Sequence, residues 1–415
     1  MVEIRSEGDQ EVMADNASLG AAKSAKNDEF YTQYSDIEAE MNAYYEYNPD
    51  VFRGKTILLP CDDPEWSNFT KYFASNFERF GLKKLISTSY AKSVGSQQLS
   101  MFEAESPLYD VDKHDTHGKL FTLTYDTNGS GAIDTDDIEF SGYLEGDGDF
   151  RSAEVCKLRD EADIIITNPP FSLFGEFLDW IRKAKKQFII IINQNAVTNK
   201  DVFPLIKDNA IWLGPGFSGG NAYFRIAPED ARQFASGVYD EKSGLVKFRN
   251  VGWLTNIDHG GRHESLILDT MAHNLKFNKR LIKKCKEDYG QLAYPHYDNY
   301  DAIEVPFVDA IPSDYDGIMG VPTNYLDKYN PDQFDIMGTV SAAQNEGSLN
   351  LGKSYKAFIG YNQDGTPNGR TGSTFGKCPV IIKDDGKHPY YEKDGVRVQA
   401  TFPRIFIRRK KGGND

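Results

Sequence analysis

The sequence predicts an α/β fold in which a mostly parallel, helix-covered sheet is followed by a β-rich region. Between residues 53 and 225, apolar strand-like runs alternate with helical patterns, which is typical of parallel sheets. Beyond residue 240 the chain changes to short aromatic strands separated by Pro, Gly, Asn and Asp. With 415 residues, 40% of them hydrophobic, the chain is long enough for about two or three domains with a sizeable core.

The first half of the predicted sheet contains two strands and one helix. TILLPCDD (56–63) is a buried strand that runs into a polar loop. SNFTKYFASNFERFG (67–81) is a helix with aromatic residues on one face, ended by Gly81. LKKLISTSY (82–90) is the second strand.

The second half follows a polar interruption. Residues 91–147 are rich in Gly, Asp and Thr, and we expect a hairpin around KLFTLTY (119–125). ADIIIT (162–167) is then a buried strand, followed by an amphipathic helix and the strand QFIIIINQ (187–194). RVQATFPRIFIRRKK (397–411) shows strand-like alternation and a basic end.

Composition limits the classes of protein that the chain can belong to. The formal charge of −15 argues mildly against nucleic acid as a partner, although net charge does not describe a single face. No apolar run approaches the roughly 18 residues that span a bilayer, so we expect no membrane segment. The polar, acidic N-terminus is neither a signal nor a transit peptide. Four widely separated cysteines suggest a reducing cytoplasm rather than zinc or disulfides.

The strand ADIIIT ends abruptly at Asn168-Pro169-Pro170-Phe171. Ligands of open parallel sheets bind beyond the carboxyl ends of the strands, so chemistry is expected here. The two prolines make a stiff turn whose carbonyls are not used in a helix, and Asn168 supplies a second acceptor. Two rigid acceptors suit an exocyclic –NH2 group, and Phe171 offers a flat surface for stacking. A plain strand-ending turn is the alternative interpretation.

These groups fit the chemistry of an adenine amine. Its lone pair is delocalised into the ring, and two acceptors on its hydrogens would favour a geometry in which the lone pair can attack an electrophilic methyl group. Placement of the reactants is then the main source of rate. The base must first leave the stack, which costs a few kcal/mol, and stacking on Phe171 returns about 1–3 kcal/mol.

Several motifs in order resemble the EcoRI-type adenine-specific (N6) DNA methyltransferase family. Asn-Pro-Pro-Phe resembles the catalytic motif of S-adenosylmethionine-dependent amino-methyltransferases. The resemblance covers most of residues 26–340, and the segments that carry it are KNDEFYTQYSDIEAEM (26–41), GDGDFRSAE (146–154), TNPPFSLFGEF (167–177), NQNAVTNKDVF (193–203) and GFSGGNAYFRI (216–226).

The resemblance implies a Rossmann-like domain that binds S-adenosylmethionine and a C-terminal region that recognises the target. It places a flexible lead at 1–25, the catalytic domain at 26–240 with the insertion 91–147, and the β-rich target-recognition region at 241–415. The implied catalytic residues are Asn168, Pro169, Pro170 and Phe171. The implied cofactor-binding residues are Tyr31, Thr32, Pro60, Cys61, Asp62, Asp149, Phe150 and Asn168.

The implied role of each residue follows from its motif. Thr32 contacts the carboxylate of the cofactor's methionine part, and Asp149 accepts from the cofactor's adenine amine with Phe150 packed nearby. The chain departs from the wider pattern at two places. The first loop lacks Gly-x-Gly, and LISTSY ends without the carboxylate that commonly binds ribose, which leaves Asp62, Asp63 or Glu65 as alternatives.

The expected function is the transfer of a methyl group from S-adenosylmethionine to N6 of a flipped adenine in duplex DNA. We expect a cytoplasmic monomer in a bacterial or phage-infected cell, either paired functionally with a restriction endonuclease or solitary. The alternatives are the same chemistry on RNA adenine or protein glutamine, and a catalytically silent DNA-binding module. The recognition sequence cannot be read from the residues. Candidate DNA contacts are Lys353, Lys356, Arg370, Arg404, Arg408 and Arg409.

Two further motifs have plainer interpretations than metal binding. DTNGSGAIDTDD (126–137) imitates a calcium loop but ends in Asp137 instead of Glu, and a polar hairpin turn is favoured over a calcium-dependent interaction site. His259 and His263 have Gly-Gly between them. The glycines disfavour a helix that would present both histidines on one face, so a surface loop is favoured over a metal site. No metal ligands are therefore assigned.

Overall fold

The computed structural model divides the chain into two compact units, Met1–Gln194 with Leu213–Gly260 (unit 1) and Asn195–Trp212 with Gly261–Asp415 (unit 2). The predicted boundary at 240/241 differs from this division, because a strand beyond it, β12 (Val251–Thr255), lies in the large sheet of unit 1. The structure describes residues 31–64, 67–91, 106–217, 221–225, 238–340, 359–371, 380–382, 390–393 and 396–410.

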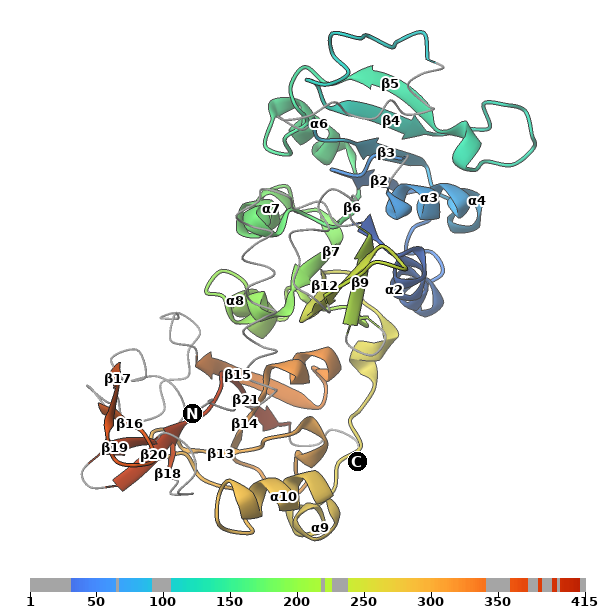
Figure 1. The fold of residues 1–415 in the computed structure, drawn as a ribbon. Coiled ribbons are helices and arrows are strands. Elements are labelled where there is room, and N and C mark those ends of the chain that lie inside the picture. Colours follow the sequence, from blue (N-terminus) through green and yellow to red (C-terminus); the bar gives the residue numbers. More distant parts are fainter. Residues whose placement is uncertain are drawn as a thin grey trace. The chain divides into compact units, whose positions relative to one another are not determined.

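Unit 1 is built on a large sheet, which among the described residues has the strand order β5-β4-β3-β2-β6-β7-β12-β8 (Figure 1). The central strands β3, β2, β6 and β7 are parallel, and β4, β5 and β12 pair antiparallel. The expected mixed α/β fold with a mostly parallel sheet is therefore confirmed. The strands are β2 (Thr56–Leu59), β3 (Lys84–Thr88), β4 (Lys119–Leu123), β5 (Glu139–Tyr143), β6 (Ile164–Thr167), β7 (Gln187–Asn193) and β8 (Trp212–Leu213).

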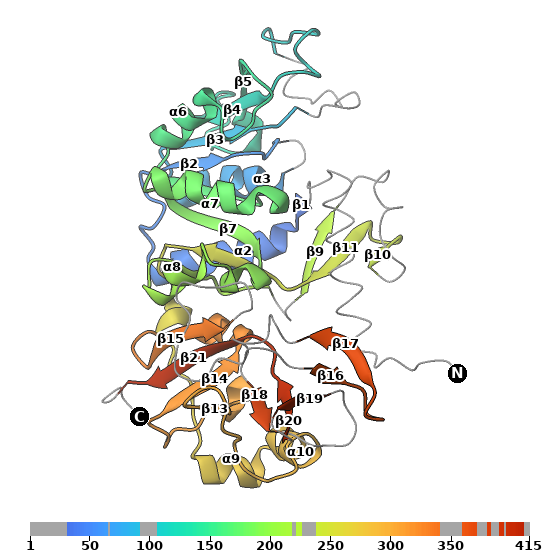
Figure 2. The same cartoon turned by 90° about the vertical axis from the view of Figure 1, so that its left-hand side faces the viewer.

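The central strands are buried on both faces. Ile164, Ile165 and Ile166 of β6 are all fully buried, although successive side chains of a strand point to opposite faces. Continuous apolar runs are expected where helices cover both sides of a parallel sheet. Helices α6 (Ala153–Glu161) and α7 (Phe174–Lys183) cover one face, and α2 (Tyr34–Tyr47), α3 (Asn68–Ser75) and α4 (Phe77–Phe80) cover the other (Figures 1 and 2).

The helix predicted over 67–81 is interrupted. Ser67 caps its start by accepting from the N–H of Phe69, and Gly81 ends it in the left-handed conformation, as predicted. Asn76, at φ −111° and ψ 13°, leaves helical geometry and separates α3 from α4. The aromatic face persists across this break, since Phe69, Tyr72, Phe73, Phe77 and Phe80 are all buried.

The predicted hairpin in the insertion consists of β4 and β5, which pair antiparallel. The calcium-like segment is the turn between them. Asp137 accepts from the N–H groups of Thr127, Asn128 and Asp134 at 2.8, 3.3 and 3.0 Å, and Asp126 accepts from those of Gly129, Ser130 and Gly131. Both carboxylates thus hold the turn together, in line with the favoured polar-turn interpretation.

A second, smaller sheet of unit 1 is antiparallel and has the order β1-β9-β11-β10 among the described residues. It joins the start of the described chain, Tyr31–Thr32 (β1), to segments beyond residue 220. The other strands are β9 (Asn221–Arg225), β10 (Tyr239–Asp240) and β11 (Leu245–Arg249).

Unit 2 is rich in strands, as the sequence predicts for this part of the chain. One described sheet has the order β13-β14-β21-β15 and another the order β17-β16-β19-β20-β18. The helices are α8 (Phe203–Lys207), α9 (Met271–Phe277) and α10 (Lys279–Glu287). The strands are β13 (Ala302–Glu304), β14 (Ile318–Pro322), β15 (Phe334–Val340), β16 (Ile359–Tyr361), β17 (Pro367–Thr371), β18 (Val380–Ile382), β19 (Tyr390–Lys393), β20 (Val396–Ala400) and β21 (Arg404–Arg409). No helix in the described part of the chain is long and apolar enough to cross a membrane.

A buried ion pair ties the last strand of unit 2 to the first. Arg404 of β21 donates through Nη2 to Oε1 of Glu304 at 2.6 Å and through Nε to Oε2 at 3.0 Å. The side chain of Glu304 is fully buried and that of Arg404 is 11% exposed. The hydroxyl of Tyr297 also donates to Glu304. Arg404 is therefore occupied with an internal partner.

We predict that Arg404→Met destabilises the protein by about 3–5 kcal/mol, because it leaves the carboxylate of Glu304 buried without its countercharge. Urea unfolding of the whole protein, followed by circular dichroism, measures the loss. Arg408→Met is the matched control, since Arg408 lies on the same strand but is exposed, and it should change stability by less than about 0.5 kcal/mol. Equal effects of the two substitutions would contradict a structural role for the pair.

Candidate active site

The predicted corner Asn168-Pro169-Pro170-Phe171 lies at the carboxyl end of β6, among the central parallel strands. Pro169 is buried, whereas Asn168, Pro170 and Phe171 are half-buried, so the corner is not sealed in the core. The short 3₁₀ helix η2 (Phe171–Leu173) follows and leads directly into α7. A loop at this edge of an open parallel sheet is positioned to meet a ligand.

The groups of the corner differ in their hydrogen bonding and burial. The carbonyl of Pro170 accepts from the N–H of Leu173 at 3.0 Å, so this carbonyl is used inside the turn, contrary to the expectation that both proline carbonyls stay outside helical hydrogen bonds. The amide oxygen of Asn168 is shielded from solvent. Phe171 is partly buried and packs against the main core of unit 1.

A buried carboxyl links the corner to the loop after β2. Asp62, 7% exposed, accepts from the hydroxyl of Ser67 at 2.7 Å, and its other oxygen lies 2.6 Å from the hydroxyl of Thr167, the residue before Asn168. Its backbone is held as well, because its N–H donates to the carbonyl of Thr88 at 2.7 Å. The ends of β2, β3 and β6 therefore meet at Asp62, which was predicted to contact the cofactor and here binds internal partners.

The hydrogen bonds around Thr167 indicate the protonation state of Asp62. The Thr167 hydroxyl also lies 2.7 Å from the carbonyl of Pro60, yet a hydroxyl carries a single proton. Both short distances are satisfied when a protonated Asp62 donates to Thr167 and Thr167 donates to Pro60. Burial raises the pKa of Asp62 to about 7, partly offset by the hydroxyls of Thr167 and Ser67, and this agrees with a carboxyl that is protonated below neutral pH.

The loop containing Gly148 and Asp149 packs against the end of β3. Gly148 has φ +87°, and a Cβ there would lie 2.3 Å from the carbonyl oxygen of Ser89. A glycine is required because the two backbones approach so closely. The N–H of Ala91 donates to the carbonyl of Asp147 at 2.7 Å and completes the contact. Asp149 is thereby held beside the second strand, the part of the sheet that lacks the usual ribose-binding carboxylate.

Arg151 orients Asp149. Its Nη2 and Nε donate to the two oxygens of Asp149 at 2.6 and 2.9 Å, and its Nη1 donates to Glu176 of α7 at 2.9 Å. The guanidinium holds the pKa of Asp149 below its ordinary value. Phe150, by contrast, is 2% exposed and packs edge-on against Phe177 and Trp180, so it belongs to the core under α7.

Thr32 is joined to the same region through the start of α3. Its carbonyl accepts from Nδ2 of Asn68 at 2.7 Å. Its hydroxyl is buried and makes no hydrogen bond to any residue that the structure describes. Tyr31 is described only as backbone in β1. Cys61 has φ +67°, a left-handed conformation that bends the chain after β2.

The residues predicted to contact DNA differ in whether the structure describes them and in whether they have internal partners. Lys353 and Lys356 lie outside the described residues, and Arg370 is described only as backbone of β17. Arg404 forms the buried pair with Glu304. Arg409 donates to the carbonyl of Ser313, whereas Arg408 is exposed.

The prediction that His259 lies on a surface loop is wrong. It is 4% exposed, its Nε2 lies 3.0 Å from the carbonyl oxygen of Leu213, and its ring meets Tyr44 of α2 edge-on at 5.5 Å. The loop after β12 folds back onto α2, which the local pattern Gly-Gly could not reveal. No cluster of three potential metal ligands occurs among the described residues.

Sequence reasoning missed the residues that hold the site together. Ser67 and Asn68 at the start of the predicted helix, and Arg151 and Thr167 within motif segments, were given no role. A signal existed for Arg151, which directly follows Gly-Asp-Phe. No signal identified Thr167 as a partner of Asp62, because the two are 105 residues apart.

A comparison of the whole sequence with known families decides the identity. The model of a family described as "Adenine-specific methyltransferase EcoRI" matches residues 18–410. The chain belongs to this family. It is 41% identical over 327 residues to the type II methyltransferase M.EcoRI of Escherichia coli, covering 78% of this chain and 89% of the relative.

Two Mycoplasma proteins are also similar to this chain. The type II methyltransferase M.MgeORF184P of Mycoplasma genitalium is 31% identical over 355 residues, 84% of this chain and 93% of the relative. M.MpnI of Mycoplasma pneumoniae is 31% identical over 326 residues, 76% and 83% of the two chains. No solved structure matches significantly. The expectation of an adenine-specific DNA methyltransferase is confirmed by this family membership.

We predict that Asp62→Asn flattens the dependence of stability on pH. With a folded pKa of about 7 and an ordinary value of 3.8, the protonated carboxyl stabilises the fold fully below pH about 4, and this stabilisation is lost as pH rises through about 7. Asparagine keeps a donor for Thr167 at every pH. Melting temperatures measured between pH 5 and 8 should therefore fall less in the variant than in the wild type.

The control for this prediction is Asp179→Asn on the exposed side of α7, which should keep the wild-type pH dependence. A wild-type slope that survives in Asp62→Asn would show that this carboxyl is ionised throughout, and the proton arrangement around Thr167 would be wrong.

Proposed function

We propose that the protein transfers a methyl group from S-adenosylmethionine to N6 of an adenine extruded from duplex DNA. The observation that carries the proposal is the half-exposed Asn168–Phe171 corner at the end of β6. It is joined by one buried carboxyl, Asp62, to the loop after β2. The two loops that would hold the two reactants are therefore positioned by the same group.

Two features support a site for S-adenosylmethionine. The buried hydroxyl of Thr32, which has no hydrogen-bond partner among the described residues, is a donor suited to the carboxylate of the methionine part. Asp149, kept ionised and oriented by Arg151, is an acceptor suited to the adenine amine. Pro60 and Cys61 supply the turn between these groups. When bound, S-adenosylmethionine supplies an electrophilic methyl carbon.

The protein's own contribution to the chemistry is placement. In this proposal the amide oxygen of Asn168 and the carbonyl of Pro169 accept the two hydrogens of the target amine and so direct its lone pair out of the base plane. Phe171, which is partly buried against the core, stacks on the flipped base. Stacking of this kind offsets about 1–3 kcal/mol of the cost of extrusion.

Recognition of the DNA sequence is assigned to unit 2, because unit 1 is occupied by the sheet and its two reactant loops. Arg408 is the predicted contact that is exposed there. We propose a monomer acting in a bacterial cell, alone or beside a restriction endonuclease that it opposes.

We predict that Asn168→Ala lowers the methylation rate by about 100- to 1,000-fold, since one of two preorganised acceptors at the reacting amine is lost. The affinity for S-adenosylmethionine should change little. Methylation is measured by sequencing DNA from cells that express each variant and by single-turnover assays, and cofactor affinity by calorimetry.

The control for Asn168→Ala is Asn128→Ala, an exposed residue of the β4–β5 turn, which should methylate like the wild type. Full activity of Asn168→Ala would refute the mechanism. Methylation of RNA or of a glutamine peptide, with none of duplex DNA, would replace the proposed substrate.

We predict that Thr32→Val weakens cofactor binding without lowering the stability of the fold. Removal of a buried hydroxyl without a partner should leave stability unchanged or raised. Loss of a hydrogen bond to a charged group should weaken S-adenosylmethionine binding by roughly 10- to 100-fold. Thr70→Val is the opposite control, because the Thr70 hydroxyl donates to the carbonyl of Asp62, and that variant should be less stable. Unchanged cofactor affinity in Thr32→Val would remove Thr32 from the site.

A further inference from the structure

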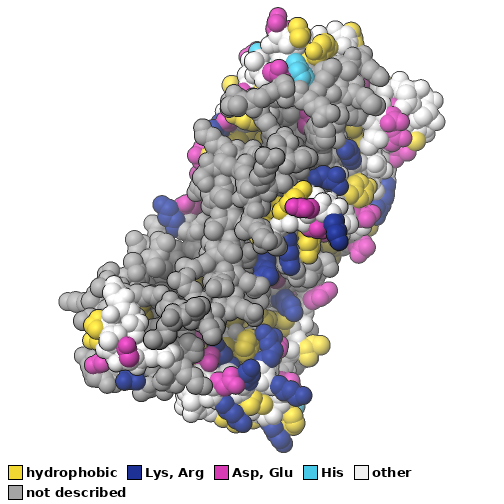
Figure 3. Space-filling model, viewed as in Figure 1, with side chains coloured by type: hydrophobic (Ala, Val, Ile, Leu, Met, Phe, Trp, Pro, Cys, Tyr) yellow, Lys and Arg dark blue, Asp and Glu magenta, His cyan; other side chains and the backbone are white. Residues whose placement is uncertain are grey.

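Helices α9 and α10 of unit 2 carry a concentration of positive charge that no part of the proposed mechanism uses. Residues 271–287, MAHNLKFNKRLIKKCKE, contain six Lys or Arg residues and one acidic residue, Glu287, in a chain whose formal charge is −15. The dark blue side chains gather over these helices in Figure 3. A local excess of this sign on an acidic protein calls for an anionic partner.

The orientation of α10 is fixed by its buried side. Leu281 and Cys285 are fully buried. At 3.6 residues per turn, Lys279, Lys283 and Lys286 fall within about 60° of one another on the opposite side. All three are exposed, Lys283 to 73%. These three lysines, together with Lys276 at the end of α9, are called the basic face below.

The basic face is only partly neutralised by its neighbours. Lys283 lies 3.9 Å from Glu287, an exposed pair worth little in water. Lys276, Lys279 and Lys286 make no ion pair with any residue in the described part of the chain. Their charges are therefore available to a partner.

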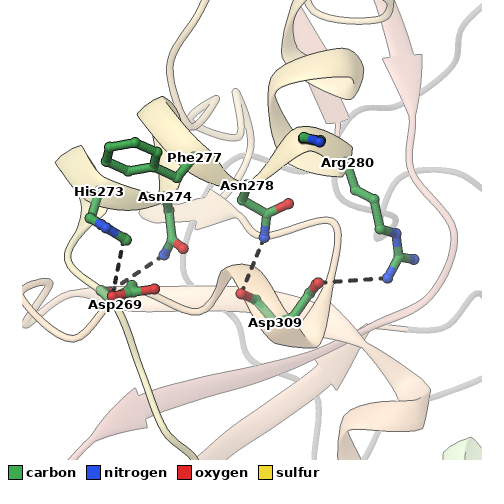
Figure 4. A pocket seen from close by; sticks show the side chains of 8 residues that line it. Asp269, His273, Asn274, Phe277, Asn278, Arg280 and Asp309 are labelled. Carbon is green, nitrogen blue, oxygen red and sulfur yellow. Dashed lines mark hydrogen bonds and ion pairs between the residues drawn. The ribbon is translucent and has the colours of Figure 1, made fainter.

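A hollow adjoins the basic face and is lined in part by Lys279. It measures about 370 Å³ and is lined by residues of α9, α10 and the turn at Asp309 (Figure 4). His273 lies 3.1 Å from Asp269, and Arg280 lies 3.7 Å from Asp309. These two pairs are internal to the hollow and leave the lysines of the basic face without ion-pair partners there.

We propose that the basic face binds the phosphate backbone of duplex DNA. The inference rests on the proposed function and adds a sequence-independent contact surface to it. From Lys279 to Lys286 the helix rises about 10 Å, comparable with the axial rise of about three nucleotides on one strand. A lipid surface fits less well, because the apolar residues Leu281 and Cys285 of α10 face the core, although Phe277 at the end of α9 is exposed.

The test compares DNA binding of the triple variant Lys279→Gln, Lys283→Gln, Lys286→Gln with that of the wild type. The probe is a labelled random-sequence 40-base-pair duplex, and fluorescence anisotropy is recorded between about 50 and 200 mM salt. Each phosphate contact contributes roughly 0.9 to the slope of log affinity against log salt. The variant's slope should be shallower by about 2–3, and its affinity at low salt lower.

The matched control removes the same charge from unit 1 through Lys157→Gln, Lys183→Gln and Lys185→Gln, all exposed, and should keep the wild-type slope. A second variant with arginine at positions 279, 283 and 286 should also keep it. Calorimetry with S-adenosylmethionine and the melting temperature verify that every variant is folded.

Three results would overturn the proposal. If the triple variant has the slope of its control while the wild type methylates DNA, the basic face is not a DNA surface and the proposed function stands. If the wild type neither binds nor methylates DNA, the proposed function itself fails. If the same lysines instead mediate binding to vesicles containing phosphatidylserine, the partner is a membrane surface.

Discussion

The carboxyl of Asp62 is the group on which the arrangement of the site depends. It holds the start of α3 through Ser67 and the end of β6 through Thr167, and its own backbone is held by the end of β3. A carboxyl in this position loses solvation and gains two hydroxyl contacts. The burial effect is the larger, which raises its pKa. Below about pH 7 the group therefore acts as an uncharged hydrogen-bonding bridge between the reactant loops.

Such a bridge suits a reaction in which the protein forms no covalent bond. Rate then comes from holding an amine and a methyl group in line, and small displacements are costly. The Asn168–Phe171 corner has two rigid supports, one through Thr167 and Asp62 and one through the packing of Phe171 on the core. A third connection runs from Asp149 through Arg151 to Glu176 on α7, the helix that directly follows the corner. The Asp149 loop and the corner are thus both attached to α7, and the loop after β2 is attached to the end of β6 through Asp62 and Thr167.

The strands at the centre of unit 1 were predictable because buried strands have uninterrupted apolar runs, such as Ile164–Ile166. Gly81 was predictable as a helix end, because it alone can adopt the left-handed conformation without strain. Features that depend on distant partners were not. Thr167 meets Asp62 across 105 residues, Arg404 meets Glu304 across 100, and β12 joins the sheet as an antiparallel strand after the pattern has changed. The motif around Asn168 was visible because it is contiguous, while its supporting residues are scattered.

The net charge of the chain likewise does not describe the local charge of one face. A formal charge of −15 would repel a polyanion if it were spread evenly, yet at physiological salt exposed charges interact over only about 8 Å. What a DNA backbone meets is therefore the face that it approaches, and the acidic remainder of the surface makes other approaches less favourable. Arg404, basic in sequence but committed to Glu304, contributes nothing to such a face. Lys279 and Lys286 of α10, displayed by a helix whose apolar side is fixed in the core, are exposed and make no ion pair among the described residues. An acidic protein can in this way direct a polyanion to a few positions, because its net charge disfavours all the others.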